Sequence, residues 1–210
     1  MRRMNKKVRQ RKMKKFENVA IDLETLDTKA SAKILSIGVV PFDWNEQVDF
    51  IELLGRPSSL YIKIDLSSYH DAFTESKSTR EWWEKQGEEA RFVLESLSSD
   101  VNIVHALGAL CAHLETWVQP LSKDGGQVFC RGYDFDGGIL NHALDAYRFI
   151  SPWSYNRFRC IRTVIDTLAD TRNGYIREAN PEGFIKHHAL HDAAKDVLTM
   201  LRLKNGVTPQ

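Results

Sequence analysis

Two acidic residues in an apolar stretch near the start of the chain have the types and the spacing to do chemistry. Asp22 and Glu24 lie in residues 19–25, Val-Ala-Ile-Asp-Leu-Glu-Thr, a run that predicts a buried β-strand. Side chains two residues apart in a strand project from the same face, so the two carboxylates lie together. Burying unpaired ions costs on the order of several kcal/mol each. A divalent cation would offset that cost, although a solvated strand end also accommodates such a pattern.

A second acidic pair lies where a later strand is expected to end and a helix to begin. Residues 131–140 read Arg-Gly-Tyr-Asp-Phe-Asp-Gly-Gly-Ile-Leu and contain Asp134 and Asp136. A helix N-terminus favours negatively charged side chains, and aspartate is a common capping residue. Capping and metal binding are both open interpretations of this pair.

A third motif near the C-terminus combines histidine with aspartate. Residues 187–196 contain the pattern H-x4-D twice, as His187 with Asp192 and as His191 with Asp196. Histidine is the side chain whose ordinary pKa lies closest to neutral pH, which suits a general base. The spacing matches no zinc-binding pattern, and a solvated helix start is the structural alternative.

The elements that must position these residues follow from hydrophobic periodicity. Three strands come first, the first two joined by a short polar segment and therefore antiparallel, and strands then alternate with helices. This order predicts an α/β fold with a mixed sheet of five to six strands, flanked by helices. The expected strands are 18–23, 34–40, 60–65, 127–131 and a brief one before 161; the expected helices are 79–97, 101–118, 135–147, 161–168 and 189–204.

Composition limits the class of protein. The 210 residues are 42% hydrophobic and 27% charged, typical of a soluble domain, and no apolar run reaches the ~20 residues of a membrane span. Cys111, Cys130 and Cys160 form neither a disulfide framework nor a zinc spacing, which favours a reducing cytoplasm. We therefore expect a cytoplasmic protein with no membrane partner.

Charge is distributed unevenly along the chain. Residues 1–15 hold nine of the 29 basic residues and no acid, which leaves 20 basic against 28 acidic residues, a net charge of −8, in residues 16–210. We expect a basic, disordered N-terminal arm followed by one domain over 16–210. The arm would attract phosphates, or it is a leader with no role, since Met4 and Met13 are alternative starts.

The three motifs, in their order along the chain, resemble the DEDDh exonucleases of the ribonuclease H-like superfamily. Phe135-Asp136 followed by Leu140 fits the second motif of that family and favours Asp136 over Asp134. Residues 187–193 match its frequent third motif, H-x-A-L-x-D-A, and favour His187 with Asp192.

A narrower resemblance covers residues 16–203. Trp82-Trp83 after Thr79, and Arg162-Thr163 after Cys160, are similar to the mycobacterial-type 3'–5' exoribonucleases, whose prophage members are often labelled exodeoxyribonuclease VIII. One departure concerns residues 131–134, Arg-Gly-Tyr-Asp, where many DEDDh members have an asparagine. This departure affects expected substrate contacts rather than the expected ligand.

The resemblance implies a two-metal 3'–5' exonuclease that releases nucleoside 5'-monophosphates from single-stranded RNA or DNA. Two Mg²⁺ or Mn²⁺ ions would be held by Asp22, Glu24, Asp136 and Asp192, with His187 as the general base. The substrate contacts expected by analogy are Leu23, Thr25, Trp82, Trp83 and Arg162. Adjacent residues of a helix face different directions, so at most one of the two tryptophans should reach a base.

Two further statements complete the expectations. Relatives in the subfamily suggest a homodimer. The alternative to an enzyme is a non-catalytic nucleic-acid-binding or scaffold protein that keeps the fold and uses the basic arm. That alternative predicts a lost ligand, whereas all four carboxylates and the histidine are present.

Overall fold

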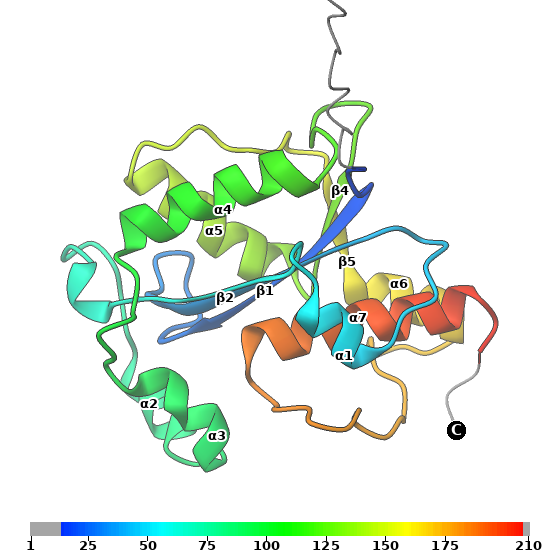
Figure 1. Cartoon of the computed structure of the whole chain (residues 1–210). Helices are drawn as coiled ribbons and strands as arrows, with labels where there is room; N and C mark the ends of the chain where they lie inside the picture. The colour runs from blue at the N-terminus through cyan, green and yellow to red at the C-terminus, as the bar shows by residue number, and fades with distance from the viewer. Residues whose placement is uncertain (1–13, 208–210) are drawn as a thin grey trace, which may run out of the picture.

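A five-stranded mixed sheet forms the centre of the computed structural model, which describes residues 14–207 (Figure 1). The strand order is β3-β2-β1-β4-β5. β1 pairs antiparallel with β2, as β2 does with β3, whereas β1–β4 and β4–β5 are parallel. The predicted mixed sheet is confirmed, with strands β1 (Asn18–Thr25), β2 (Ile34–Phe42), β3 (Leu60–Lys63), β4 (Gln127–Cys130) and β5 (Phe158–Cys160).

Strand β2 continues two residues past its predicted end at Val40. Pro41 pairs with Val19 of β1, and the strand runs on to Phe42. A proline cannot donate a hydrogen bond, so it normally avoids a central strand. Here β3 covers only Ser36 to Val39, so the outer side of β2 needs no ladder bond at Pro41.

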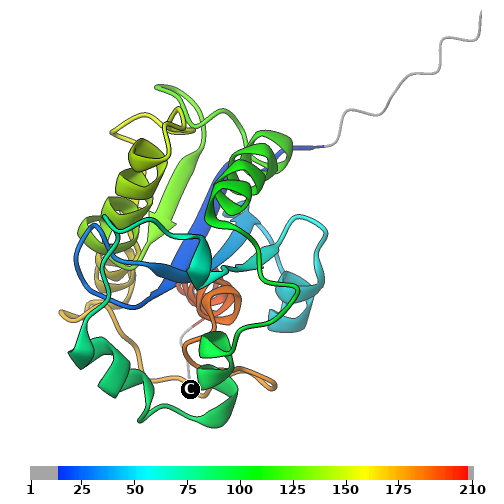
Figure 2. The ribbon, with the colours of Figure 1, turned by 90° about the vertical axis from the view of Figure 1, so that its left-hand side faces the viewer.

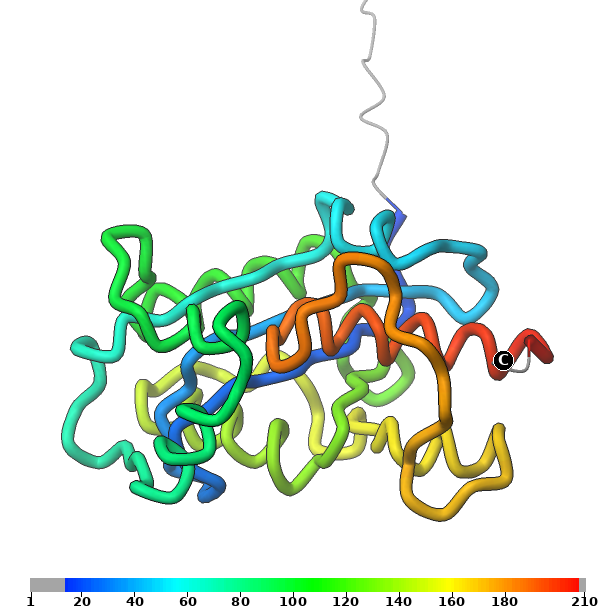
Figure 3. The backbone as a smooth tube through the Cα atoms, turned by 90° about the horizontal axis from the view of Figure 1, so that it is seen from below, coloured from blue at the N-terminus to red at the C-terminus, as the bar shows by residue number. Residues whose placement is uncertain are grey.

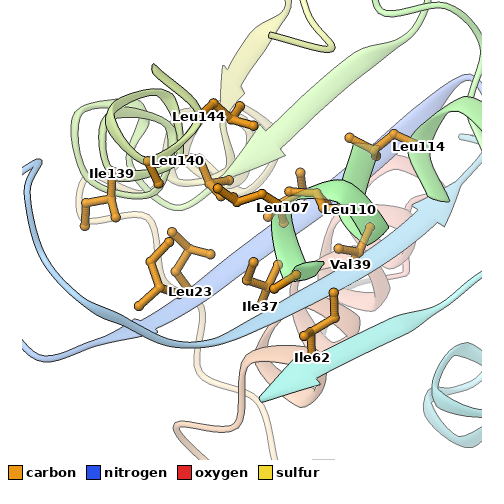
Figure 4. Close-up of a cluster of buried hydrophobic side chains, with 14 of the residues drawn as sticks. Leu23, Ile37, Val39, Ile62, Leu107, Leu110, Leu114, Ile139, Leu140 and Leu144 are labelled. Carbon is orange, nitrogen blue, oxygen red and sulfur yellow. The ribbon is translucent and has the colours of Figure 1, made fainter. Parts of the chain in front are cut away.

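Helices cover both faces of the sheet. One face packs on α4 (Ile103–Trp117) and α5 (Gly138–Ala146) through the large core cluster drawn in Figure 4. The other face packs on the helices that lie on the opposite side in Figure 1, which are α1 (Phe50–Gly55), α6 (Ile161–Ala169) and α7 (Ala189–Lys204). The bounds of α7 equal those predicted, and α1, capped by Asp49, was not predicted.

Side-chain alternation along β1 decides which face receives the acidic pair. Val19, Ile21 and Leu23 belong to the α4–α5 core, and Ala20 belongs to the core under α7. Because successive side chains of a strand point to opposite faces, Asp22 and Glu24 project toward α7. The third motif therefore begins the helix that covers the first motif.

The helix expected over 79–97 is broken, which corrects the sequence-based prediction. The structure has α2 (Lys77–Trp83), α3 (Glu88–Arg91) and a 3₁₀ turn at Phe92–Leu94. Gly87 has extended backbone (φ −60°, ψ 157°) and is the N-cap residue of α3, so the chain changes direction there. Figure 2 shows both short helices at the periphery. They pack on the sheet through a small cluster that contains Leu26, Trp83 and Val93.

The segment between α6 and α7 has no regular structure but is held along α7. Lys195 Nζ donates to Asn180 Oδ1 at 2.7 Å, and Thr199 Oγ1 donates to Glu178 Oε1 at 2.5 Å. Figure 3 shows this segment returning to the N-terminus of α7. Short turns complete the fold: a 3₁₀ turn at Leu66–Ser68 and a π-helical turn at Tyr133–Gly137, which replaces the start of the helix expected from 135.

The expected basic arm lies mostly outside the described residues. Of residues 1–15 only Lys14 and Lys15 are described, and Lys14 Nζ forms an ion pair with Asp43 at 2.8 Å. Within residues 14–207, no helix has both the length and the apolar character needed to cross a bilayer.

Candidate active site

A cleft of about 810 Å³ opens where β1 and β4 end, and it brings the three sequence motifs together. Its walls include all five residues predicted to be catalytic, which are Asp22, Glu24, Asp136, His187 and Asp192. They come from three segments that are far apart in the sequence: β1, the π-helical turn at Tyr133–Gly137 and the start of α7. The sheet topology, rather than local sequence, therefore assembles this cleft.

The acidic pair of β1 has no compensating partner in the protein. Glu24 is only 8% exposed, and Asp22 is the one residue of β1 that is not fully buried. Among residues 14–207 neither carboxylate has an ion-pair or hydrogen-bond partner, and each is surrounded by other carboxylates. Because burial without a partner is costly, the pair predicts a ligand of positive charge.

A glycine in β2 lets the third motif approach the first. Gly38 pairs with Asp22 in the β1–β2 ladder, and the first turn of α7 lies directly over it. A Cβ atom at this position would lie 2.2 Å from the carbonyl carbon of Ala189, a distance that no side chain tolerates. The missing side chain thus allows His187 and Asp192 to lie beside Glu24.

The second motif joins the site through the backbone of the first. Asp136 is 3% exposed in the π-helical turn, and the backbone N–H of Leu23 near its carboxylate opposes the rise of its pKa. Leu23 itself is buried and borders the cleft between the two acidic residues. Asp134 is exposed and does not line the cleft, so the geometry distinguishes the two aspartates of this motif.

His187 and Asp192 are held by unusual backbone at the start of α7. His187 has φ +63°, the left-handed region that few residues other than glycine adopt. Its backbone N–H donates to Asp192 Oδ2 at 2.7 Å, which closes the turn. One ligand atom each from Glu24, His187 and Asp192 lie within 4.8 Å of one another. Such strain is typical of functional sites, and here it directs an imidazole toward carboxylates.

The alternative pair has a different environment. The His191 ring packs edge-on against Phe50 at 5.5 Å between centroids, its Nδ1 accepts the Ile185 N–H at 3.1 Å, and it does not line the cleft. Asp196 does line the cleft, but Arg131 binds it with two nitrogens, Nη2 at 2.7 Å and Nε at 2.9 Å. Asp196 is therefore already neutralised.

Electrostatics in the cleft are dominated by buried negative charge. Burial, followed by the charges of Asp136, Glu24 and Asp192, raises the pKa of Asp22 well above its ordinary value. Burial and the neighbouring aspartates likewise raise the pKa of Glu24 well above its usual range. Burial raises the pKa of Asp136 to about 7 and that of Asp192 to about 6. The cluster therefore favours any cation that reaches it.

His187 is shifted in the direction that suits a base. Partial burial, followed by the charge of Lys186, lowers the pKa of His187. The imidazole is consequently neutral at neutral pH and can accept a proton.

The two adjacent tryptophans line the cleft but differ in exposure. Trp82 is 40% exposed on the cleft wall, and its ring meets the His187 ring edge-on at 4.7 Å between centroids. Trp83 is 1% exposed, and its indole N–H donates to the Thr25 carbonyl at 2.9 Å. Trp83 and Thr25 thus form buried support for the cleft, and Trp82 presents a face to it.

The cleft is also lined by Arg162 and by residues that the sequence motifs did not predict. Arg162, a predicted substrate contact, is exposed in the first turn of α6, and its charge opposes the rise in the pKa of Asp136. Beside it are aromatic and basic side chains of the irregular segment and of α7: Tyr175, Phe184, Lys186 and Lys195. Periodicity gives no signal for such a segment, although its density of aromatic and basic residues is a weak one.

Comparison with known proteins gives consistent matches. The family model described as 3'-5' exoribonuclease Rv2179c-like domain matches residues 17–202. A protein of Enterobacteria phage T4 named "Exodeoxyribonuclease" is 31% identical over 202 residues, covering 86% of each chain.

Solved structures share the fold at low identity. Cell-death related nuclease 4 has a TM-score of 0.62 at 13% identity; the match covers 91% of this chain but only 64% of that one. The nuclease domain of 3'hExo, described as a DEDDh family member bound to rAMP, has a TM-score of 0.55 at 10% identity, with 93% and 96% covered.

Proposed function

The chain belongs to the Rv2179c-like 3'–5' exoribonuclease family, and from this premise we propose that it removes nucleoside 5'-monophosphates from the 3' end of single-stranded nucleic acid. Family membership makes it a 3'–5' exonuclease of the DEDDh type. The observation that carries the finer proposal is the buried cluster of Asp22, Glu24, Asp136 and Asp192, with His187 beside it.

The donor set fits two divalent cations. Four carboxylates supply hard oxygen ligands and a charge that two such ions balance, which suits Mg²⁺ or Mn²⁺. The unpartnered Asp22 and Glu24, with their raised pKa values, are the observation that supports occupancy. When bound, the ions would neutralise the phosphate and stabilise the attacking and leaving oxygens.

His187 is the residue that we assign to proton transfer. Its neutral imidazole lies within 4.8 Å of ligand atoms of Glu24 and Asp192, so a water in the cleft falls within its reach. The imidazole would take the proton of that water as it attacks the terminal phosphate. Positioned bases of this kind contribute about 10²–10⁴ in rate.

The cleft walls are suited to the terminal nucleotides. Trp82 offers an exposed ring on which a base can stack, a contact worth about 1–3 kcal/mol. Arg162 supplies positive charge to a phosphate at the Asp136 side. Leu23 and Thr25 border the cleft between and after the acidic pair, and Trp83 supports this wall from the core.

The polymer is the open choice, because the names of the matches differ. The family description specifies an exoribonuclease, and the phage T4 relative is named an exodeoxyribonuclease. The decisive experiment digests matched RNA and DNA strands, single and double, each with Mg²⁺ or Mn²⁺. We expect a ladder of products shortened from the 3' end, with 5'-monophosphates released.

Asp22→Ala is the test variant, and Asp134→Ala is its matched control. Asp134 is an exposed aspartate of the second motif that lies outside the cleft. Asp22→Ala should abolish trimming while Asp134→Ala retains it. Trimming by Asp22→Ala would refute the proposal, and binding without hydrolysis by the native protein would favour the non-catalytic alternative.

Three organisational expectations accompany this proposal. We propose one nuclease domain over residues 16–210, a homodimer, and a cytoplasmic location. Light scattering after size-exclusion chromatography tests the dimer, and limited proteolysis tests the domain.

A further inference from the structure

A second cavity of about 810 Å³ adjoins the catalytic cleft. It lies between residues 168–177 and the C-terminal end of α7 around Leu203, and we name it the distal groove. Tyr175, which is 54% exposed, lines both the distal groove and the cleft. The two hollows therefore meet at one aromatic side chain.

The distal groove carries positive charge that the protein does not use. Arg172 and Arg177 line it and are exposed. Within residues 14–207 neither arginine forms an ion pair or a side-chain hydrogen bond, and Asp170 is the one acid among the described lining residues. Residues 16–210 have a net charge of −8. Two unpaired arginines in one groove therefore have the opposite sign to the net charge of the domain. Their chemistry fits a phosphate backbone.

The junction between the cleft and the distal groove is firmly held. Arg131 Nη1 donates to the Gly174 carbonyl at 3.1 Å, and the Tyr175 ring lies 4.4 Å from the Arg131 guanidinium carbon. Asp166 Oδ1 accepts the Gly174 N–H at 2.8 Å and the Thr171 hydroxyl at 2.6 Å. The surface is therefore formed before any ligand binds, which lowers the entropic cost of binding.

The length of the path agrees with a polymer. From Asp192 to Leu203 the axis of α7 spans about 17 Å, at 1.5 Å per residue. Stacked nucleotides rise about 3.4 Å each along a strand, so the path accommodates about five of them. A mononucleotide product would not extend this far.

We propose that the distal groove binds the backbone of the single-stranded nucleic acid upstream of its 3'-terminal nucleotides, with Tyr175 as the stacking platform between the two hollows. This inference rests on the proposed function and names a substrate-binding surface outside the catalytic cleft. Arg172 and Arg177 contact phosphates without reading sequence. The contribution of the groove should therefore grow with the length of the strand.

The test compares strands of three and twelve nucleotides. Fluorescence anisotropy with Mg²⁺ measures binding to the inactive Asp22→Ala protein, alone and combined with Arg172→Ala/Arg177→Ala. We expect the arginine changes to weaken binding of the 12-mer at least tenfold more than binding of the trimer. The slope of log K against log salt should fall by about 1.4, since each phosphate contact on a single strand contributes about 0.7. Lys123→Ala/Arg148→Ala removes two other exposed basic residues and serves as the charge-matched control.

Tyr175 gives an independent readout in the active enzyme. We expect Tyr175→Ala to lower the ratio of kcat/KM for the 12-mer to that for the trimer, and Tyr175→Phe to restore the ratio because the ring is kept. If the arginine variant keeps the native salt slope and the native ratio of 12-mer to trimer affinity, the proposed role of the distal groove is overturned. An equal loss of binding in the Lys123→Ala/Arg148→Ala control would also overturn it, because net charge alone would then explain the effect. Failure of the native enzyme to trim any strand would instead refute the proposed function, because the binding measurements stand apart from cleavage.

Discussion

Two histidine–aspartate pairs with the same spacing occur at the start of α7, and the fold places them in opposite circumstances. His187 precedes the helix with left-handed backbone and lines the cleft, whereas His191 lies within the helix and packs against Phe50. Asp192 accepts one backbone N–H from the chain, whereas Asp196 is bound by two nitrogens of Arg131. Identical spacing therefore leads to one pair whose members both line the cleft and one pair that is held by Phe50 and Arg131.

The difference between the aspartates teaches that countercharge, rather than position, decides which carboxylate is available. Asp192 and Asp196 are four residues apart on one helix and share a face, and both reach the cleft. Burial raises the pKa of both carboxyls, but Arg131 opposes this shift most strongly at Asp196. Asp192 is thus free of a protein countercharge, whereas Asp196 is already paired with the Arg131 guanidinium.

Replacing each of the two aspartates in turn by asparagine should give the largest difference in activity. Asp192→Asn should lower kcat/KM at least about 10³-fold, or about 4 kcal/mol of transition-state stabilisation, because it removes a charged ligand. Asp196→Asn keeps an oxygen that accepts from Arg131, so its kcat/KM should fall by no more than about tenfold. Steady-state trimming of a labelled strand measures both. Equal losses would remove the distinction between the pairs.

The histidines should separate by a smaller factor. His187→Ala should reduce kcat about 10²–10³-fold through loss of the base, with little change in KM. His191→Ala should keep kcat within about threefold, since its ring does not line the cleft. The pH–rate profile adds a check, because His187→Ala should lose the acidic limb and His191→Ala should retain it. The opposite pattern would transfer the third motif to His191.

Sequence reasoning reached this comparison but could not resolve it from residue types. The alternation of side chains along a strand placed Asp22 and Glu24 on one face, and helical periodicity predicted the bounds of α7. Both predictions depend on local patterns. The choice between His187 and His191 depends on Gly38, which lets α7 approach β2, and this contact spans about 150 residues of chain.

The irregular segment shows the same limit more strongly. Residues 170–188 have no periodicity, and their path is set by distant partners such as Arg131 to Gly174 and Lys195 to Asn180. Tyr175 therefore could not be assigned to the cleft from sequence. The helix expected over 79–97 failed for a local reason instead, since Gly87 adopts extended backbone within it.

Removing Arg131, the countercharge of Asp196, should lower the stability of the protein. Arg131→Met leaves Asp196 buried without its partner, and we expect a loss of about 3–5 kcal/mol in the free energy of unfolding. Arg131→Met/Asp196→Leu should recover most of this loss, because a hydrophobic pair of similar volume replaces the ions. Lys77→Ala, which breaks an exposed ion pair with Glu81, is the control and should change the unfolding midpoint little. A small effect of Arg131→Met would mean that Asp196 is not paired in solution.

The smallest predicted effect is a gain in stability on removing the charge of Asp192. The pKa of Asp192 is raised to about 6 in the fold, above its ordinary value of 3.8, so its charged form destabilises the metal-free protein at pH 8. Asp192→Asn should therefore unfold about 2–4 °C higher than the native protein in EDTA at pH 8, which corresponds to about 1 kcal/mol. The gap should close as the pH falls from about 6 toward 4, because the native carboxyl becomes protonated in the fold first.

Histidines 187, 188 and 191 have lowered pKa values and oppose this trend, but they occur in both proteins and cancel in the difference. Millimolar Mg²⁺ should reverse the order, since only the native site binds it well. The pKa of Asp196 is also raised by burial, but Asp196→Asn leaves the Arg131 guanidinium without its countercharge, so this variant should be less stable than the native protein at pH 8. A gain in stability there would show that the ion pair with Arg131 does not offset the burial of Asp196.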